Sequence, residues 1–327
     1  MISEPWLNNS SEYRPPLICI VGPTAVGKSA LALALAPLLS AEIISADSRQ
    51  VYRYLDVGTA KPTAEEQCAV QHHLIDVVDP EDDFSLAEFQ DRAYLAIDDV
   101  LQRGRIPLLV GGTGLYVRAV ADGLQLPRVA PDPELRKLLE AYAAEHGPEA
   151  LHGRLTVVDP LAASRIDPRN VRRVIRALEV IEKSGQPFSL ESVPRPRYDV
   201  LTLGVTTDRA TLYRQIDARI DWQIQNGLIE ETRTVLDRGC PTNRPAISGL
   251  GYREIVAFLE GRMDLPTAVE RIKFETHRFS RQQYTWFRLE DPRIHWLTPG
   301  PWAVKRALAL IARHLHGSSQ LTLEVIQ

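Results

Sequence analysis

The residues with the clearest chemical meaning are Gly22–Ser29, which read GPTAVGKS and match the pattern G-x-x-x-x-G-K-[ST]. The apolar run Leu17–Val21 precedes them, and the alanine- and leucine-rich segment Ala30–Leu35 follows. This order predicts a strand, a phosphate-binding loop and the start of a helix. The glycines let backbone N–H groups point at an anion, and the helix N-terminus adds positive potential.

This loop predicts a site for a phosphate or a pyrophosphate. Lys28 would supply a point charge, and the hydroxyl of Ser29 is placed to bind Mg²⁺. A strand-to-helix turn that binds nothing is the alternative. The motif leaves open whether the phosphate belongs to a nucleotide, and other parts of the chain must decide that question.

A carboxylate is expected opposite the loop. The predicted second strand, Glu42–Ser45, leads into Asp47-Ser48-Arg49-Gln50. Because ligands collect beyond the carboxyl ends of parallel strands, we expect Asp47 to face the bound phosphate. It could hold Mg²⁺ through water or accept a proton from a nucleophile. A helix N-cap or an Asx-turn accounts for an aspartate here equally well.

A glycine-rich strand end forms the third chemical feature. The predicted fourth strand, Ile106–Val110, ends in Gly111-Gly112-Thr113-Gly114. A P-loop ATPase more often has an aspartate near a strand end here to organise Mg²⁺. The glycines leave the backbone open, which favours a loop that a ligand approaches closely over a plain tight turn.

Two basic segments suggest contact with nucleic acid. In the first, Asp167 is expected to cap a helix that begins at Pro168. Its arginines share one face, opposite an apolar stripe of Val171, Val174, Ile175 and Leu178: they are Arg169, Arg172, Arg173 and Arg176. Solvated charge runs usually mix signs, so this run favours contacts with a phosphate backbone.

The second basic segment is a predicted helix, Pro266–Leu289, in which cations alternate with aromatic residues such as Phe279 and Trp286. Such a mixture suits stacking on unpaired bases, although helical aromatics commonly belong to a core. Arg214 and Arg219, on another predicted helix, are further candidates for binding anions. His72 and His73 point to opposite faces of a strand and are interpreted as structural.

The fold class predicted is α/β, with a parallel sheet flanked by helices and a helical insertion domain. Strands are expected at Leu17–Val21, Glu42–Ser45, His73–Val77, Ile106–Val110, Val200–Val205 and Ile294–Leu297. We expect a disordered leader at 1–13, a core formed by 14–123 and 198–327, and the insertion at 124–197, between proline-rich hinges. One continuous domain with a helical flank is the alternative.

Composition limits the function classes. The chain has 327 residues and a net charge of −4, which argues against indiscriminate binding of nucleic acid but allows a local basic surface. No apolar run is long enough to span a bilayer. Three scattered cysteines form no C-x-x-C pair and fit a reducing cytoplasm. We therefore expect a cytoplasmic protein that does not bind a membrane. A monomer is expected as well, although composition does not decide the oligomeric state.

Several segments together resemble the tRNA dimethylallyltransferases, also called tRNA isopentenyltransferases, of bacterial type. The matching segments occur in the family's order. The Cys/His zinc module that some eukaryotic relatives carry is not found in this sequence, which points to the bacterial type. They are GPTAVGKS at 22–29, SADSRQ at 45–50, GTAKP at 58–62, IPLLVGGTGLY at 106–116, RALEV at 176–180, GLGYR at 249–253 and TWFR at 285–288. The phosphate loop alone is generic, whereas GTAKP, LVGGTGLY and TWFR in this order are specific.

The resemblance implies a P-loop NTPase-like fold and transfer of a dimethylallyl group from its diphosphate to the exocyclic amine of the tRNA adenine 3′ of the anticodon. The loop would then hold the prenyl diphosphate with Mg²⁺ rather than ATP, through Gly22, Pro23, Thr24, Ala25, Val26, Gly27, Lys28 and Ser29. Asp47 would be the general base, Thr113 would lie in the reaction channel, and Arg219 would assist at the diphosphate.

The resemblance also implies which segments touch tRNA. They comprise Asp47, Ser48, Arg49, Gln50, Thr113, Arg136, Arg172, Arg173, Val174, Ile175, Arg176, Arg281, Gln282, Gln283, Tyr284, Thr285, Trp286, Phe287 and Arg288. The family commonly has Lys-Arg-Gln where this chain reads Arg281-Gln282-Gln283, so one cation is lost and one RNA contact is weakened. A small-metabolite kinase and a non-catalytic RNA-binding P-loop protein are the rival interpretations.

Overall fold

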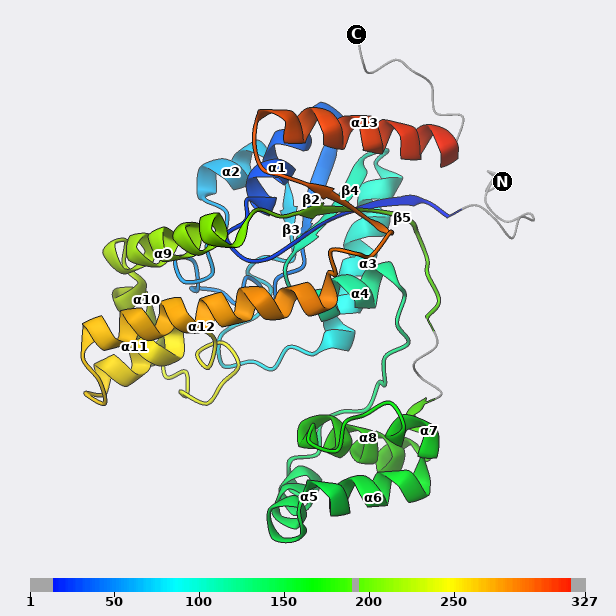
Figure 1. The fold of residues 1–327 in the computed structure, drawn as a ribbon, viewed down its shortest axis with the longest axis vertical. Coiled ribbons are helices and arrows are strands. Elements are labelled where there is room, and N and C mark those ends of the chain that lie inside the picture. Colours follow the sequence, from blue (N-terminus) through cyan, green and yellow to red (C-terminus); the bar gives the residue numbers. More distant parts are fainter. Residues whose placement is uncertain (1–13, 190–193, 319–327) are drawn as a thin grey trace, which may run out of the picture. The chain divides into compact units, whose positions relative to one another are not determined.

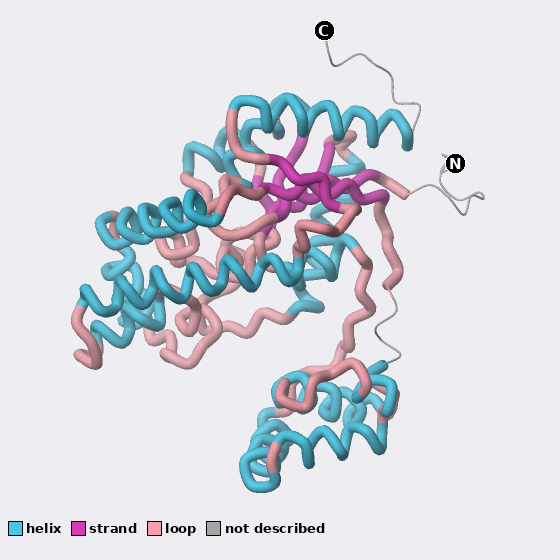
Figure 2. Tube along the Cα trace, in the orientation of Figure 1, coloured by secondary structure: helices cyan, strands magenta, loops and turns pink. Residues whose placement is uncertain are grey.

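The computed structural model describes residues 14–189 and 194–318. The chain divides into two compact units: Met1–Ala121 together with Arg197–Gln327, and Asp122–Pro196. Figure 1 shows the elements of each unit, and Figure 2 separates helix, strand and loop. The leader expected at 1–13 lies outside the described residues.

The first unit contains a six-stranded, fully parallel sheet with the order β3-β2-β4-β1-β5-β6. The strands are β1 (Pro16–Val21), β2 (Ala41–Ser45), β3 (His72–His73), β4 (Ile106–Gly111), β5 (Asp199–Val205) and β6 (Ile294–Leu297). The predicted α/β fold class is thereby confirmed, and all six expected strands exist.

The third strand is much shorter than the expected His73–Val77. Leu74 and Asp76 adopt left-handed backbone conformations, with φ of 64° and 56°, which a strand does not allow. The N–H groups of Asp76 and Val77 bond instead to the carbonyls of Gln50 and Val51. The apolar run therefore closes a loop against Gln50 and Val51, in the segment that follows β2.

Helices cover both faces of the sheet, so β1 is buried on both sides. Its residues alternate between two apolar cores, with Ile18 and Ile20 in one and Leu17, Cys19 and Val21 in the other. The helices of this unit are α1 (Lys28–Leu35), η1 (Pro37–Leu39), α2 (Ala64–Ala69), α3 (Leu86–Gln102), α4 (Gly114–Ala121), α9 (Arg209–Gln225), α10 (Leu228–Asp237), α11 (Tyr252–Leu259), α12 (Leu265–Trp286) and α13 (Pro301–Ser318). In the part of the chain that the structure describes, no helix is long and apolar enough to cross a membrane.

The second unit is helical in its described part and has an apolar core of its own. Its helices are α5 (Pro133–His146), α6 (Pro148–Val158), α7 (Pro160–Ala163) and α8 (Val171–Ser184). Helix α8 begins three residues later than expected, since Asn170, not Asp167, caps it by accepting a hydrogen bond from the Arg173 N–H. Asp167 accepts from the Arg169 N–H instead, so Arg169 precedes the helix.

Candidate active site

The phosphate loop has the backbone that its sequence predicts. Gly22 and Gly27 have φ of 142° and 98°, a region that glycine enters without strain. A Cβ on Gly22 would also lie 2.3 Å from the carbonyl oxygen of Val205 on β5. Two glycines of the motif are thus explained by the path of the backbone between β1 and α1.

Lys28, at the first position of α1, folds back over this loop. Its ammonium donates a 2.7 Å hydrogen bond to the carbonyl of Pro23. Burial lowers the pKa of Lys28 from 10.5 to about 8, an effect that Asp47 opposes and Arg219 reinforces. A cation held in this way gains more than an exposed lysine when an anion arrives, because the anion offsets its desolvation.

The loop forms one side of a cavity of about 410 Å³. The expected catalytic residues Asp47, Thr113 and Arg219 line the same cavity as Lys28 and Ser29. All of its lining residues belong to the first unit. The sequence therefore identified groups that the fold brings together from four segments of the chain.

Asp47 performs the structural task expected of it and still lines the cavity. Its Oδ1 accepts a 2.8 Å hydrogen bond from the Arg49 N–H, which is the Asx-turn that was the alternative to function. The Ser48 N–H donates to Thr113 Oγ1 at 3.1 Å and so joins the ends of β2 and β4. The turn therefore fixes the direction of the Asp47 carboxylate relative to Thr113.

The glycines at the end of β4 also have a packing role, which the sequence analysis did not predict. A Cβ on Gly111 would lie 2.1 Å from the Ala46 carbonyl oxygen, and one on Gly114 would lie 2.3 Å from the Trp286 ring. A Cβ on Gly112 would lie 2.3 Å from Nε2 of Gln283. Protein atoms occupy the space beside all three glycines, although Gly111, Gly112 and Thr113 do line the cavity.

Arg219 reaches the phosphate loop from α9. Its Nη1 donates a 3.3 Å hydrogen bond to Thr24 Oγ1. Burial lowers the pKa of Arg219, and attraction to Asp47 opposes the shift. Arg214, the other candidate on this helix, is exposed, bonds to Thr211 and does not line the cavity.

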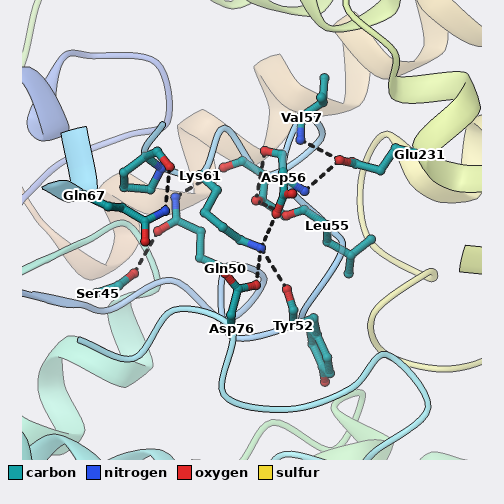
Figure 3. A network of polar contacts seen from close by, with 12 residues as sticks. Ser45, Gln50, Tyr52, Leu55, Asp56, Val57, Lys61, Gln67, Asp76 and Glu231 are labelled. Atoms are coloured by element: carbon teal, nitrogen blue, oxygen red, sulfur yellow. Dashed lines mark hydrogen bonds and ion pairs between the residues drawn. The ribbon is translucent and has the colours of Figure 1, made fainter. Parts of the chain in front are cut away.

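Glu231, which the sequence analysis did not single out, holds together the cavity wall formed by the GTAKP and GLGYR segments. The carboxylate of Glu231, on α10, accepts hydrogen bonds from the N–H groups of Asp56, Val57 and Gly58 at 2.7, 2.7 and 3.0 Å, two of which appear in Figure 3. The Tyr252 hydroxyl donates a fourth, of 2.7 Å. Glu231 thus ties the GTAKP segment to the GLGYR segment, and both line the cavity.

A buried lysine supports the same wall. Lys61 donates to the Tyr52 carbonyl at 3.1 Å and forms ion pairs with Asp56 and Asp76 at 2.5 and 2.6 Å (Figure 3). Close packing requires a glycine at position 58 of the same segment, since a Cβ there would lie 2.4 Å from the Tyr252 ring. The role of Glu231 cannot be read from a local sequence pattern, because its hydrogen-bond partners lie far away in the sequence.

The two adjacent histidines, interpreted as structural, each have a contact within the fold, and His72 also lines the cavity. His73 Nε2 lies 2.7 Å from the carboxylate of Glu42, which is 1% exposed and also binds Arg103 and Arg105. Hydrogen bonds from Arg103 lower the pKa of Glu42 to about 2. The ring of His72 bonds to the Val70 carbonyl.

The segment at the end of α12 divides into buried and exposed residues. Phe287 belongs to the apolar core, and Gln283 is 4% exposed, so the side chains of these two expected RNA contacts do not face solvent. The exposed side chains, which keep the predicted role, are Arg281, Gln282, Thr285, Trp286 and Arg288. Tyr284 is half-buried and its hydroxyl lies 2.9 Å from Thr206 Oγ1.

The arginine face of the helical unit is also smaller than expected. Arg169 pairs with Asp167 at 2.7 Å. The side chains of Val174 and Ile175 are in the unit's core, as the apolar stripe predicted, so these two expected RNA contacts do not face solvent. Arg172 and Arg173 are exposed. The like-charged run that favoured a phosphate backbone therefore reduces to these two residues, with Arg176 beside them.

Arg136 and Arg176 share an internal anion. The Glu179 carboxylate, 0% exposed, accepts from Arg136 Nε at 2.7 Å and from Arg176 Nη1 at 2.5 Å. Burial alone would raise the pKa of Glu179, but bonds from Arg136, the Asp132 N–H and Arg176 lower it to about 2. Both arginines thus have a structural task besides any RNA contact.

Fold and cavity together define a P-loop protein in which a carboxylate, Asp47, lines the same cavity as the phosphate loop. The chain matches the family described as IPP transferase over residues 50–290 and the one described as isopentenyl transferase over residues 15–78. It is 53% identical to the tRNA dimethylallyltransferase of Roseiflexus castenholzii, over 93% of this chain and 99% of the relative. It is 55% identical to that of Chloroflexus aurantiacus, over 86% and 96%.

Solved structures agree. The full-length tRNA isopentenylpyrophosphate transferase from Bacillus halodurans superposes with a TM-score of 0.71 at 40% identity, covering 94% of this chain and 99% of that one. A eukaryotic dimethylallyltransferase captured acting on tRNA gives 0.80 at 25% identity, covering 95% and 81%. The chain belongs to the tRNA dimethylallyltransferase family, which confirms the resemblance and makes it a prenyltransferase.

Proposed function

We propose that this chain transfers the dimethylallyl group of dimethylallyl diphosphate to N6 of the adenine 3′ of the anticodon in tRNA and releases diphosphate. The observation that supports this most is the shared cavity, which Asp47, Arg219 and the phosphate loop all line. Family membership supports the same reaction and gives no support to a kinase or to a non-catalytic P-loop protein.

The proposed reaction is a displacement at the allylic carbon. The adenine N6 lone pair is delocalised into the ring, so Asp47 accepts a hydrogen bond from the amine and takes its proton as the N–C bond forms. The C–O bond breaks, and its electron pair leaves with the diphosphate. Lys28, Arg219 and the loop N–H groups stabilise the growing negative charge.

The residues present fit a magnesium ion that arrives with its diphosphate. Ser29 would hold it through its hydroxyl, with the remaining ligands from diphosphate oxygens and water. The ion would supply further charge neutralisation at the leaving group. Among the described residues no cluster of three or more His, Cys, Asp or Glu side chains could hold a metal, which fits a site completed by the substrate.

The RNA part of the proposal uses exposed side chains. Arg172 and Arg173 on α8, and Arg281, Trp286 and Arg288 at the end of α12, would bind phosphates and stack on bases. The target adenine must leave its stack to reach the cavity. We further propose that the protein acts as a monomer in the cytoplasm, where tRNA is found.

One experiment tests this proposal. The full chain is incubated with Mg²⁺, labelled dimethylallyl diphosphate and unmodified tRNA, and label is measured in the RNA. We expect label that depends on an adenine 3′ of the anticodon. Absence of label in RNA, with folded protein and suitable tRNA, would refute the function, and phosphorylation of a small metabolite by ATP would favour the kinase.

A further inference from the structure

The buried side chain of Gln283 lies between the two loops that the proposed chemistry must hold at a fixed distance. Its Oε1 accepts a 2.8 Å hydrogen bond from the Thr24 N–H in the phosphate loop. Its Nε2 donates a 2.9 Å hydrogen bond to the Gly112 carbonyl, after β4. One amide group thus connects the phosphate loop, the Gly111–Thr113 loop and helix α12.

Burial and packing around Gln283 fit a side chain held in one position as a bridge. Gln283 is 4% exposed and lines the cavity. A Cβ on Gly112 would lie 2.3 Å from Gln283 Nε2, so only a glycine leaves room for the bridging amide. An N–H and a carbonyl at this depth each need a partner, and Gln283 supplies both a donor and an acceptor.

We propose that Gln283 is a positioning residue for diphosphate binding rather than an RNA contact. It holds the phosphate loop at a fixed distance from the strand end that carries Thr113, and it does so before any RNA is present. The neighbouring Gln282 is exposed and keeps the role of facing RNA. This inference rests on the proposed function, because it assumes that the phosphate loop binds the prenyl diphosphate.

The test measures binding of inorganic pyrophosphate with Mg²⁺ to the full chain, by calorimetry and without RNA. Gln283→Met keeps the side-chain length but removes both hydrogen bonds, and we expect binding to weaken about tenfold. The matched control Gln282→Met should bind pyrophosphate as tightly as the unmodified chain. In steady-state assays the KM for dimethylallyl diphosphate should rise in Gln283→Met, with the KM for tRNA unchanged.

A second variant distinguishes the bridge from simple packing. In Gln283→Glu a carboxylate can still accept from the Thr24 N–H but cannot donate to the Gly112 carbonyl. Protonation restores the donor, so the deficit in pyrophosphate binding, relative to the unmodified chain at the same pH, should shrink as the pH falls toward 5. A variant that fails only to pack would show no such recovery.

The opposite outcome would overturn the inference. If Gln283→Met raised the KM for tRNA and left pyrophosphate binding unchanged, Gln283 would be an RNA contact. Failure of the proposed function is visible separately, since the unmodified chain would then transfer no prenyl group to tRNA whatever Gln283 does.

Discussion

The hydroxyl of Tyr252 donates a 2.7 Å hydrogen bond to Oε1 of Glu231, the same oxygen that accepts from the Gly58 N–H. Burial and the nearby Glu231 carboxylate raise the pKa of Tyr252 well above 10, so the hydroxyl stays protonated and remains a donor. One carboxylate therefore fixes both segments of a cavity wall while its own side chain stays outside the cavity.

The first prediction concerns this carboxylate. Glu231→Gln replaces one acceptor oxygen by an amide that cannot accept from a backbone N–H, so at least one N–H of Asp56–Gly58 loses its acceptor. We expect about 1–3 kcal/mol of lost stability and a fall of about tenfold or more in kcat/KM. Chemical denaturation and steady-state kinetics measure the two effects. The exposed neighbour gives the control, Glu230→Gln, and equal behaviour of both variants would contradict the prediction.

The second prediction separates the two tasks of Asp47. Asparagine at this position can still accept from the Arg49 N–H and keep the Asx-turn, but it is not basic. Asp47→Asn should therefore slow single-turnover transfer by about 10²- to 10⁴-fold with little change in tRNA binding. Asp47→Ala should lose both the base and the turn. Weakened RNA binding with normal single-turnover chemistry would refute the role of a base.

The third prediction follows from the pKa of Lys28, which burial lowers to about 8. Diphosphate binding needs the ammonium form, so the affinity for pyrophosphate should fall as the pH rises from 7 to 9. Lys28→Met should lose this dependence. Pyrophosphate also ionises in this range, so the pH dependence measured with Lys28→Met is subtracted from that of the unmodified chain. A difference in binding free energy between the two proteins that stays constant with pH would contradict the prediction.

The lowered pKa of Lys28 also makes the stability of the fold depend on pH. Between pH 8 and 10.5 the unfolded chain keeps a proton on Lys28 that the folded chain has released. Its contribution therefore makes the free energy of unfolding rise with pH across that window. Calorimetric unfolding of the unmodified chain and of Lys28→Met across this range checks the direction.

The fourth prediction concerns the helical unit. Glu179→Gln leaves Arg136 and Arg176 without their shared buried anion, and we expect a loss of about 3 kcal/mol in that unit. Since the folded pKa of Glu179 is about 2 against 4.5 in its ordinary range, this stabilisation is present above pH 4.5 and is lost as the pH falls toward 2.

Hydrogen exchange of the amides in 122–189 measures this loss locally. The control is Glu134→Gln, whose carboxylate is exposed and pairs only with the exposed Lys137 among the described residues. Equal protection in Glu179→Gln and in the control would contradict the prediction.

Much of the site could be predicted because its signals are local. Gly22–Ser29 has a fixed spacing, and Asp47 and Thr113 follow strands whose parallel arrangement places their ends side by side. Glu231 could not be predicted, since a carboxylate on an amphipathic helix resembles any surface residue until the fold brings Asp56–Gly58 to it.

Two errors have local physical causes. Asp167 and Asn170 are both good caps, and the hydrogen bond from the Arg173 N–H to Asn170 decided between them. His73–Val77 reads as an apolar strand, but the left-handed Leu74 and Asp76 turn the chain toward Val51. In both cases sequence pattern identified the segment and a single backbone preference set its limits.

All residues that line the reaction cavity come from 24–113 and 216–283, whereas Asp122–Pro196 folds around its own core. The helical unit is therefore free to diverge at its surface without disturbing the groups that line this cavity. Exchanging it between relatives should leave the choice of prenyl donor unchanged. In this fold the surface of the helical unit and the lining of the cavity can vary independently.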